Sequence, residues 1–142
     1  MYYDHFNKNK IIRLSKFITN RLNVKIARTV LSLFEKQHHV DFLEIGHGRG
    51  DFADVLKDEK TYFNEIGLTY FGIEPNRSLC EKGIKKGYSI VNCKIPPMPP
   101  VNNGVPFDCI YMSHVLEHFT SYEIVQTVLS QIRSNLKLSP GT

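Results

Sequence analysis

The chain has 142 residues, of which 42% are hydrophobic and 23% are charged. This composition suits one ordinary globular domain and argues against wholesale disorder, a collagen-like fibre or a coiled-coil array. No apolar run approaches the roughly 18 residues of a membrane-spanning helix, and the first residues lack the apolar core of a secretory signal peptide. Three widely spaced cysteines form neither a disulfide framework nor a zinc pattern, so we expect a cytoplasmic protein.

Basic residues outnumber acidic ones by 18 to 14, which gives a formal net charge of +4, and the excess lies near the N-terminus. The first 37 residues carry eight lysines and arginines against only Asp4 and Glu35. Such a segment can attract an anionic partner such as RNA, lipid head groups or a phosphorylated substrate. A solvated helix face explains the same pattern, so a nucleic-acid partner stays an alternative.

Residues 1–38 are expected to form an N-terminal helical segment. Apolar residues recur at helical spacing between residues 11 and 33. Asn20 or Asn23 is a point at which this helix can divide into two. The apolar run from 40 to 45 then predicts a short buried strand that stops at glycine.

In the middle of the chain, predicted helices alternate with predicted strands. We expect Asp51 to cap a second helix, and residues 69–73 to form a second strand. Residues 78–86 predict a short helix closed by Gly87, and residues 88–91 predict a third strand.

Five of the seven prolines fall between Asn92 and Pro106, so this segment is predicted to be an irregular loop. A fourth strand is expected over 107–112, and Thr120 to Glu123 matches a capping box that opens a last helix. Strands alternating with helices predict a Rossmann-like, doubly wound parallel α/β sheet of about four strands over residues 39–142.

The segment from Glu44 to Asp51 reads Glu-Ile-Gly-His-Gly-Arg-Gly-Asp and follows the first predicted strand. Its glycines let the backbone turn tightly and approach a ligand. Glu74 ends the next predicted strand, where an acidic side chain can accept hydrogen bonds from ribose hydroxyls. Ligands of open α/β sheets bind beyond the carboxyl ends of the strands, so these features predict a nucleoside site.

The glycine spacing distinguishes between nucleosides. A dinucleotide site requires G-x-G-x-x-G with the pyrophosphate at the helix N-terminus, whereas this chain has G-x-G-x-G between Glu44 and Asp51. Carboxylates at both ends of the turn repel a pyrophosphate but suit a ligand with an ammonium and a sulfonium. This favours S-adenosylmethionine over NAD, and an NAD-dependent oxidoreductase is the less favoured reading.

Three segments in this order resemble motifs of the class I S-adenosylmethionine-dependent methyltransferases. They are the glycine turn at 44–50, the strand end at Phe71-Gly-Ile-Glu-Pro-Asn76, and Phe107-Asp-Cys-Ile-Tyr-Met-Ser-His-Val-Leu-Glu-His118, which is similar to the Leu-Glu-His pattern of small-molecule-type members. The resemblance implies a methyltransferase with a small-molecule acceptor. It implies cofactor contacts from Glu44, Gly46, His47, Gly48, Gly50, Glu74, Pro75, Asn92, Cys93 and Met112.

The sequence departs from the family pattern in two places. Asn92 and Cys93 stand where family members usually have an aspartate near the adenine amine. The family's sheet has seven strands, and the segment at 136–141 resembles the turn before its fifth strand. The chain is therefore expected to end within the domain, which leaves the edge of the fourth strand open to self-association. A cofactor-binding fragment without turnover is the main alternative.

His114 and His118 are the candidate catalytic bases, and both stand in a His-x-x-Glu-His pattern. This pattern also occurs in zinc proteases, where it requires a long helix centred on the motif. Here a strand ends just before the motif and a new helix begins just after it, so we expect no metal site. Methyl transfer depends mainly on positioning donor and acceptor, so no catalytic triad is needed.

Overall fold

The computed structural model describes the backbone of residues 3–61 and 66–137, and the side chains of these ranges from residue 18 onward. Its elements are α1 (Tyr3–Leu33), β1 (His39–Ile45), α2 (Asp51–Lys60), β2 (Gly67–Ile73), α3 (Arg77–Lys85), β3 (Ser89–Val91), β4 (Cys109–Met112) and α4 (Tyr122–Ser134). Two 3-10 turns, η1 (Asn102–Gly104) and η2 (Leu116–His118), flank β4. The end of the segment at 136–141 lies outside the described residues.

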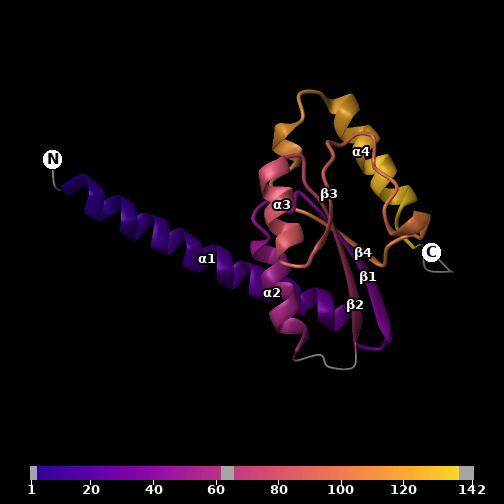
Figure 1. Cartoon of the computed structure of the whole chain (residues 1–142), viewed down its shortest axis with the longest axis horizontal. Helices are drawn as coiled ribbons and strands as arrows, with labels where there is room; N and C mark the ends of the chain where they lie inside the picture. The colour runs from indigo at the N-terminus through magenta and orange to yellow at the C-terminus, as the bar shows by residue number, and fades with distance from the viewer. Residues whose placement is uncertain (1–2, 62–65, 138–142) are drawn as a thin grey trace.

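The four strands form one parallel sheet in the order β3-β2-β1-β4 (Figure 1). This arrangement confirms the predicted Rossmann-like α/β fold, in which the carboxyl ends of all strands meet at one edge. In the register of the sheet, Glu44 of β1 lies between Gly72 of β2 and Tyr111 of β4. The central strand therefore delivers Glu44 to the middle of that edge.

The two faces of the sheet are covered by different elements. Side chains alternate along a strand, so Phe42 and Glu44 share one face of β1 while Leu43 and Ile45 share the other. Phe42 packs in a cluster with residues of α1 and α2. Leu43 and Ile45 pack with the loop after β3 and with Ile132 of α4. Glu44 therefore points to the α1–α2 side of the sheet.

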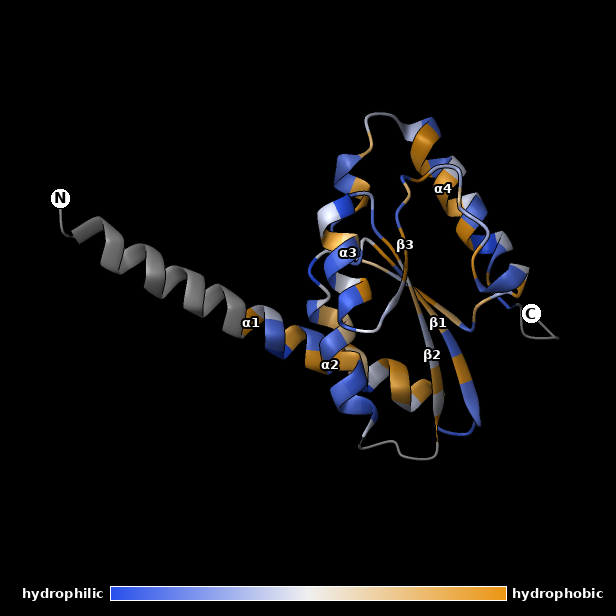
Figure 2. Cartoon of the chain, viewed as in Figure 1, coloured by the Kyte–Doolittle hydropathy of each residue, from blue (hydrophilic) through white to orange (hydrophobic). Residues whose placement is uncertain are grey.

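The first helix continues without a break from Tyr3 to Leu33, so the expected interruption at Asn20 or Asn23 was wrong. Its N-terminal part extends away from the sheet (Figure 1), and hydrophobic residues mark the part beside the sheet (Figure 2). Ala27 and Leu31 are fully buried there, and Arg28 Nε donates to Glu59 of α2 at 2.6 Å. None of the described helices is long and apolar enough to cross a membrane.

Two helix caps differ from their predictions by one residue. Gly50, with φ 79°, caps α2 without a side-chain bond, and Asp51 is the first helical residue, where its carboxylate favours the positive end of the helix. In α4 the cap is Ser121, which accepts from the backbone N of Ile124 at 3.4 Å, instead of Thr120. The predicted Gly87, with φ 88°, does follow the end of α3.

Candidate functional site at the carboxyl edge of the sheet

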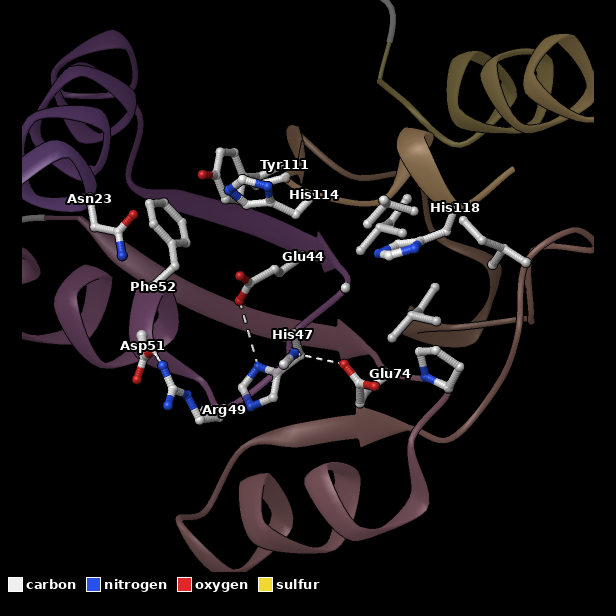
Figure 3. A pocket seen from close by; sticks show the side chains of 18 of the residues that line it. Asn23, Glu44, His47, Arg49, Asp51, Phe52, Glu74, Tyr111, His114 and His118 are labelled. Atoms are coloured by element: carbon white, nitrogen blue, oxygen red, sulfur yellow. Dashed lines mark hydrogen bonds and ion pairs between the residues drawn. The ribbon is translucent and has the colours of Figure 1, made fainter. Parts of the chain in front are cut away.

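A cavity of about 800 Å³ opens where β1, β2 and β4 end (Figure 3). One wall, here named the strand-end side, consists of the turn at 44–48 and Glu74 with Pro75. The facing wall, named the outer side, consists of one face of α1 between Thr19 and Ile26, Phe52 of α2 and the segment from Tyr111 to Phe119. The cavity is lined by nine of the twelve residues predicted to bind the cofactor or to act as the base: Glu44, Gly46, His47, Gly48, Glu74, Pro75, Cys93, His114 and His118.

Three residues for which the resemblance implies cofactor contact do not line this cavity. Gly50 caps α2. Asn92 turns its amide to the main chain, where Nδ2 donates to the carbonyl oxygens of Glu74 at 2.8 Å and Pro75 at 3.0 Å. Met112 packs in the cluster on the opposite face of the sheet, because alternation along β4 gives the cavity face to Tyr111.

The turn after β1 is held against β2 by its own backbone. Gly46 N and His47 N both donate to the carbonyl oxygen of Ile73, at 2.9 and 3.1 Å. Gly46 has φ +84°, which favours glycine, and a Cβ added there would lie 2.6 Å from Cγ2 of Val115. Glycine at this position therefore serves both the turn and the close approach of the segment after β4.

Glu74 is buried at the end of β2, with 5% of its surface exposed. Its two oxygens accept from Gly48 N at 2.7 Å and from Asn76 N at 2.8 Å. A carboxylate oxygen has two lone-pair sites, so each oxygen retains one for a ligand. This geometry suits two adjacent hydroxyl groups at the cavity.

Glu44 is a second buried carboxylate, 4% exposed, and lies near the centre of the cavity floor (Figure 3). The Tyr70 hydroxyl donates to its Oε2. Burial, and after it the charge of Glu44, raise the pKa of Tyr70 above its ordinary value, so this proton stays on the phenol. Within the described residues, the ion-pair contact of Glu44 is with His47 Nδ1, at 3.5 Å. A buried carboxylate with no lysine or arginine contact in this part of the chain suits a cationic ligand group.

The outer side contains the two candidate bases. His114 follows β4 with φ 55°, a left-handed conformation that is uncommon for a side chain of this size. Its Nδ1 lies 3.2 Å from Glu117 Oε1, and 89% of its side chain is exposed. A backbone hydrogen bond, and to a smaller extent His114, lower the pKa of Glu117, so its carboxylate is charged at neutral pH. His118 lies in η2 and lacks a carboxylate partner of this kind among the described residues.

Sequence reasoning missed the apolar lining of the outer side. Leu22, Ile26, Phe52, Tyr111 and Phe119 all line the cavity, and the rings of Phe52 and Tyr111 stack with centroids 4.2 Å apart. Strand alternation offered a signal for Tyr111, which lies level with Glu44. The docking of α1 had no such local signal, since it depends on contacts distant in sequence.

No group of three or more metal-ligating side chains that could hold an ion occurs among residues 18–61 and 66–137. His114 and His118 belong to a bend and a 3-10 turn rather than to one long helix. The geometry of the His-x-x-Glu-His segment thus differs from the helical arrangement that the zinc-protease pattern requires.

A parallel sheet with helices on both faces, a glycine turn after its central strand and buried acids at its carboxyl edge are features typical of nucleoside-binding α/β proteins. A family model described as a methyltransferase domain matches residues 3–142. The chain therefore belongs to the methyltransferase domain family. No curated protein matches its sequence.

Solved methyltransferases share the fold. The chain is similar to the plantazolicin methyltransferase BpumL in complex with SAH, with 18% identity, a TM-score of 0.63 and coverage of 95% of this chain and 51% of that one. It is also similar to the sugar N-methyltransferase KedS8 of Streptoalloteichus, with 11% identity, TM-score 0.62 and coverage of 81% and 43%. The CurJ carbon methyltransferase is 21% identical, with a TM-score of 0.62 and coverage of 80% of this chain and 31% of that one. The chain thus spans about half or less of each structure's length.

Proposed function

We propose that this chain is an S-adenosylmethionine-dependent methyltransferase domain whose cofactor occupies the strand-end side of the cavity. The observation that carries the proposal is the pair of buried carboxylates, Glu44 and Glu74, on adjacent strands. Glu74 has one free lone-pair site on each oxygen for the ribose diol. Glu44 offers a charge to the ammonium of the methionine moiety, and the glycine turn admits the ligand backbone between them.

The same residues argue against a dinucleotide. The N-terminus of α2, where a pyrophosphate would bind, already carries the carboxylate of Asp51. Arg49, the neighbouring cation, is paired with Asp51 at 3.2 Å. Glu44 and Glu74 add two further negative groups to the cavity, so a phosphate-rich ligand meets repulsion while a cationic one is attracted.

On the outer side, we assign the acceptor to the apolar space between α1 and the segment after β4. Leu22, Phe52 and Tyr111 suit a small molecule with a flat, apolar body. The bound cofactor supplies an activated methyl group on a sulfonium, and the walls of the cavity hold the acceptor in line with it. An RNA acceptor is disfavoured because the described lining carries three carboxylates, those of Glu44, Asp51 and Glu74, against two cations, Arg49 and Lys94.

His114 is the proposed base for an acceptor that must lose a proton. Glu117 accepts from Nδ1 of His114, which leaves Nε2 to take the proton from the acceptor. The charged Glu117 then stabilises the imidazolium. His118 is the second candidate, without a carboxylate partner among the described contacts.

The remaining expectations stay predictions. The three free cysteines fit a reducing compartment such as the cytoplasm. Within the described sheet β4 is an edge strand, which keeps self-association through that edge a prediction. Sedimentation velocity over a tenfold concentration range tests it, because an edge-to-edge dimer must form at the higher concentrations.

Calorimetric titration with S-adenosylmethionine and, separately, with NAD tests the cofactor assignment. We expect micromolar binding of S-adenosylmethionine and no measurable binding of NAD. Tight binding of NAD, or no binding of either by a folded chain, contradicts the proposal. Release of S-adenosylhomocysteine in the presence of a panel of small phenols and carbon acids distinguishes turnover from binding alone. Loss of that release in His114→Asn supports the assigned base.

A further inference from the structure

We propose that Tyr70 is a positioning residue that fixes the Glu44 carboxylate for the cofactor's ammonium group, and that His47 holds Tyr70 in that role. The inference rests on the proposed function and assigns to Tyr70 and His47 a task beyond packing. Neither side chain needs to touch the cofactor, because both act through Glu44.

The hydrogen bonds along this chain of residues run in one direction. Tyr70 has one hydroxyl proton, which it donates to Oε2 of Glu44. The Tyr70 oxygen lies 2.6 Å from His47 Nδ1, so Nδ1 must carry the hydrogen in that contact. His47 thus donates to Tyr70 and Tyr70 donates to Glu44. Donors in series polarise one another and concentrate negative charge on the carboxylate at their end.

The Tyr70 hydroxyl has little freedom to move away from Glu44. Its ring stacks with Phe42 at a centroid distance of 6.1 Å and lies tilted against Tyr88 at 5.3 Å. Oε2 of Glu44 already accepts from Tyr70, whereas no hydrogen bond to Oε1 occurs among the described residues, so we place the cation from the cavity at Oε1.

His47 is held in a niche made by glycines. A Cβ added to Gly83 of α3 would lie 2.7 Å from His47 Nε2, and one added to Gly50 would lie 2.9 Å from the same atom. At Gly72 an added Cβ would lie 3.3 Å from the His47 Cβ. The ring is therefore fully enclosed, with 0% of its side chain exposed.

The niche satisfies one ring nitrogen and leaves the other without a partner. His47 Nε2 is buried and has no hydrogen-bond partner among the described residues. Burying a ring nitrogen without a hydrogen-bond partner costs free energy. An apolar side chain would fill the same space without that cost. The donor at Nδ1 is what histidine adds here, and its recipient is Tyr70.

The charged groups around the pair come from several elements. Asp54 of α2 accepts from Tyr88, and Lys86, which follows α3, lies 2.6 Å from Asp54. The Tyr88 hydroxyl therefore donates to Asp54, whereas the Tyr70 hydroxyl donates to Glu44. Tyr88→Phe therefore removes a similar hydroxyl beside the same His47 ring, 5.5 Å away, and provides the matched control.

The test compares two ligands that differ by one amino group. S-adenosylhomocysteine and its deamino analogue, in which hydrogen replaces the amino group, are titrated calorimetrically into the full chain. For Tyr70→Phe we expect the affinity for S-adenosylhomocysteine to fall about tenfold, the size of one charge-assisted hydrogen bond, with the deamino analogue bound as by the wild type. Tyr88→Phe should bind both ligands unchanged.

A second pair of variants keeps Tyr70 in place. His47→Asn retains an N–H near the position of Nδ1, while His47→Leu has none. The preference for S-adenosylhomocysteine over the deamino analogue should be retained in His47→Asn and should fall in His47→Leu. Equal weakening of both ligands by Tyr70→Phe, or an unchanged preference in both Tyr70→Phe and His47→Leu, overturns the inference. Failure of the wild type to bind S-adenosylhomocysteine overturns the proposed function instead.

Discussion

The strand-end side and the outer side of the cavity differ in how their residues are held. On the strand-end side, buried acids at the ends of two adjacent strands accept fixed hydrogen bonds from backbone or from Tyr70. On the outer side, His114 is largely exposed, stands on a strained backbone and contacts Glu117 three residues away. Much of the remaining outer wall comes from one face of α1.

This difference separates two tasks. A ligand common to a whole family needs a site with little freedom, and strand ends supply it because the sheet fixes their spacing. Selection of an acceptor calls for surfaces that can vary without disturbing the sheet, and a helix face with a connecting segment meets that need.

The largest effect is expected from Glu74→Gln. An amide presents one acceptor and one NH₂ group, so it cannot accept from both Gly48 N and Asn76 N, and the ribose loses a charged acceptor. We expect affinity for S-adenosylhomocysteine to fall about 100-fold, equivalent to about 2.7 kcal/mol. Calorimetry on the variant measures this loss. Glu81→Gln, an exposed change on α3, is the control. Equal losses of affinity in the two variants would show that Glu74 does not bind the ligand.

The next effect concerns the glycine turn. Gly46→Ala and Gly104→Ala both place Cβ on a residue with positive φ, but an added Cβ meets Val115 only at Gly46, with nothing within 4 Å at Gly104. Gly104→Ala should lose about 1 kcal/mol of unfolding free energy, measured in urea, and Gly46→Ala should lose more because its Cβ also meets Val115. Only Gly46→Ala should also weaken S-adenosylhomocysteine, by about tenfold. A similar loss of affinity in Gly104→Ala contradicts a local role for the turn.

On the outer side, relief of backbone strain should raise stability. His114→Gly allows φ 55° without a Cβ and relieves about 1–2 kcal/mol of strain, while the added entropy of the unfolded chain costs about 0.4–1 kcal/mol, so we expect a net increase of up to about 1 kcal/mol in the free energy of unfolding. Cofactor affinity should not change, since the residue belongs to the other wall. His118→Gly, which has no positive φ to relieve, should give no increase. A His114→Gly variant destabilised as much as His118→Gly would show that no strain is released at position 114.

The smallest expected effect is a pH dependence of the free energy of unfolding, which comes from Asp54 beside the strand-end side. Burial tends to raise the pKa of Asp54, but hydrogen bonds from Lys86 and Tyr88 outweigh it and hold the pKa below its ordinary value. A lowered folded-state pKa gives stability that is present above the unfolded value of about 3.9 and is lost as the pH falls through the folded value.

Asp54→Asn should therefore lose stability at pH 7 and lose less at pH 3. The expected difference is below about 1 kcal/mol because the pair is half exposed. Urea denaturation at the two pH values measures it, with the exposed Asp58→Asn as the control. A loss in Asp54→Asn that is the same at pH 3 and pH 7 excludes this linkage.

The sequence was informative where local chemistry sets the structure. Gly46, Glu44 and Glu74 could be placed at one edge because glycines after a strand and an acid at the end of the next strand have positional meaning. The resemblance implied cofactor contact for Met112, which packs on the opposite face of the sheet, whereas alternation from Glu44 through the sheet register points to Tyr111. Tyr70 reaches Glu44 across two strands, and α1 reaches the cavity from a distant segment, so neither contact has a local pattern.

The most direct test of the account is a crystal structure of the chain with S-adenosylhomocysteine. We expect both ribose hydroxyl oxygens within hydrogen-bond distance, about 2.5–3.0 Å, of the Glu74 carboxylate. The ligand's amino nitrogen should lie beside Oε1 of Glu44, with Tyr70 still bound to Oε2. A ligand whose ribose lies away from Glu74, or whose amino group faces away from Glu44, would contradict the division of the cavity described above.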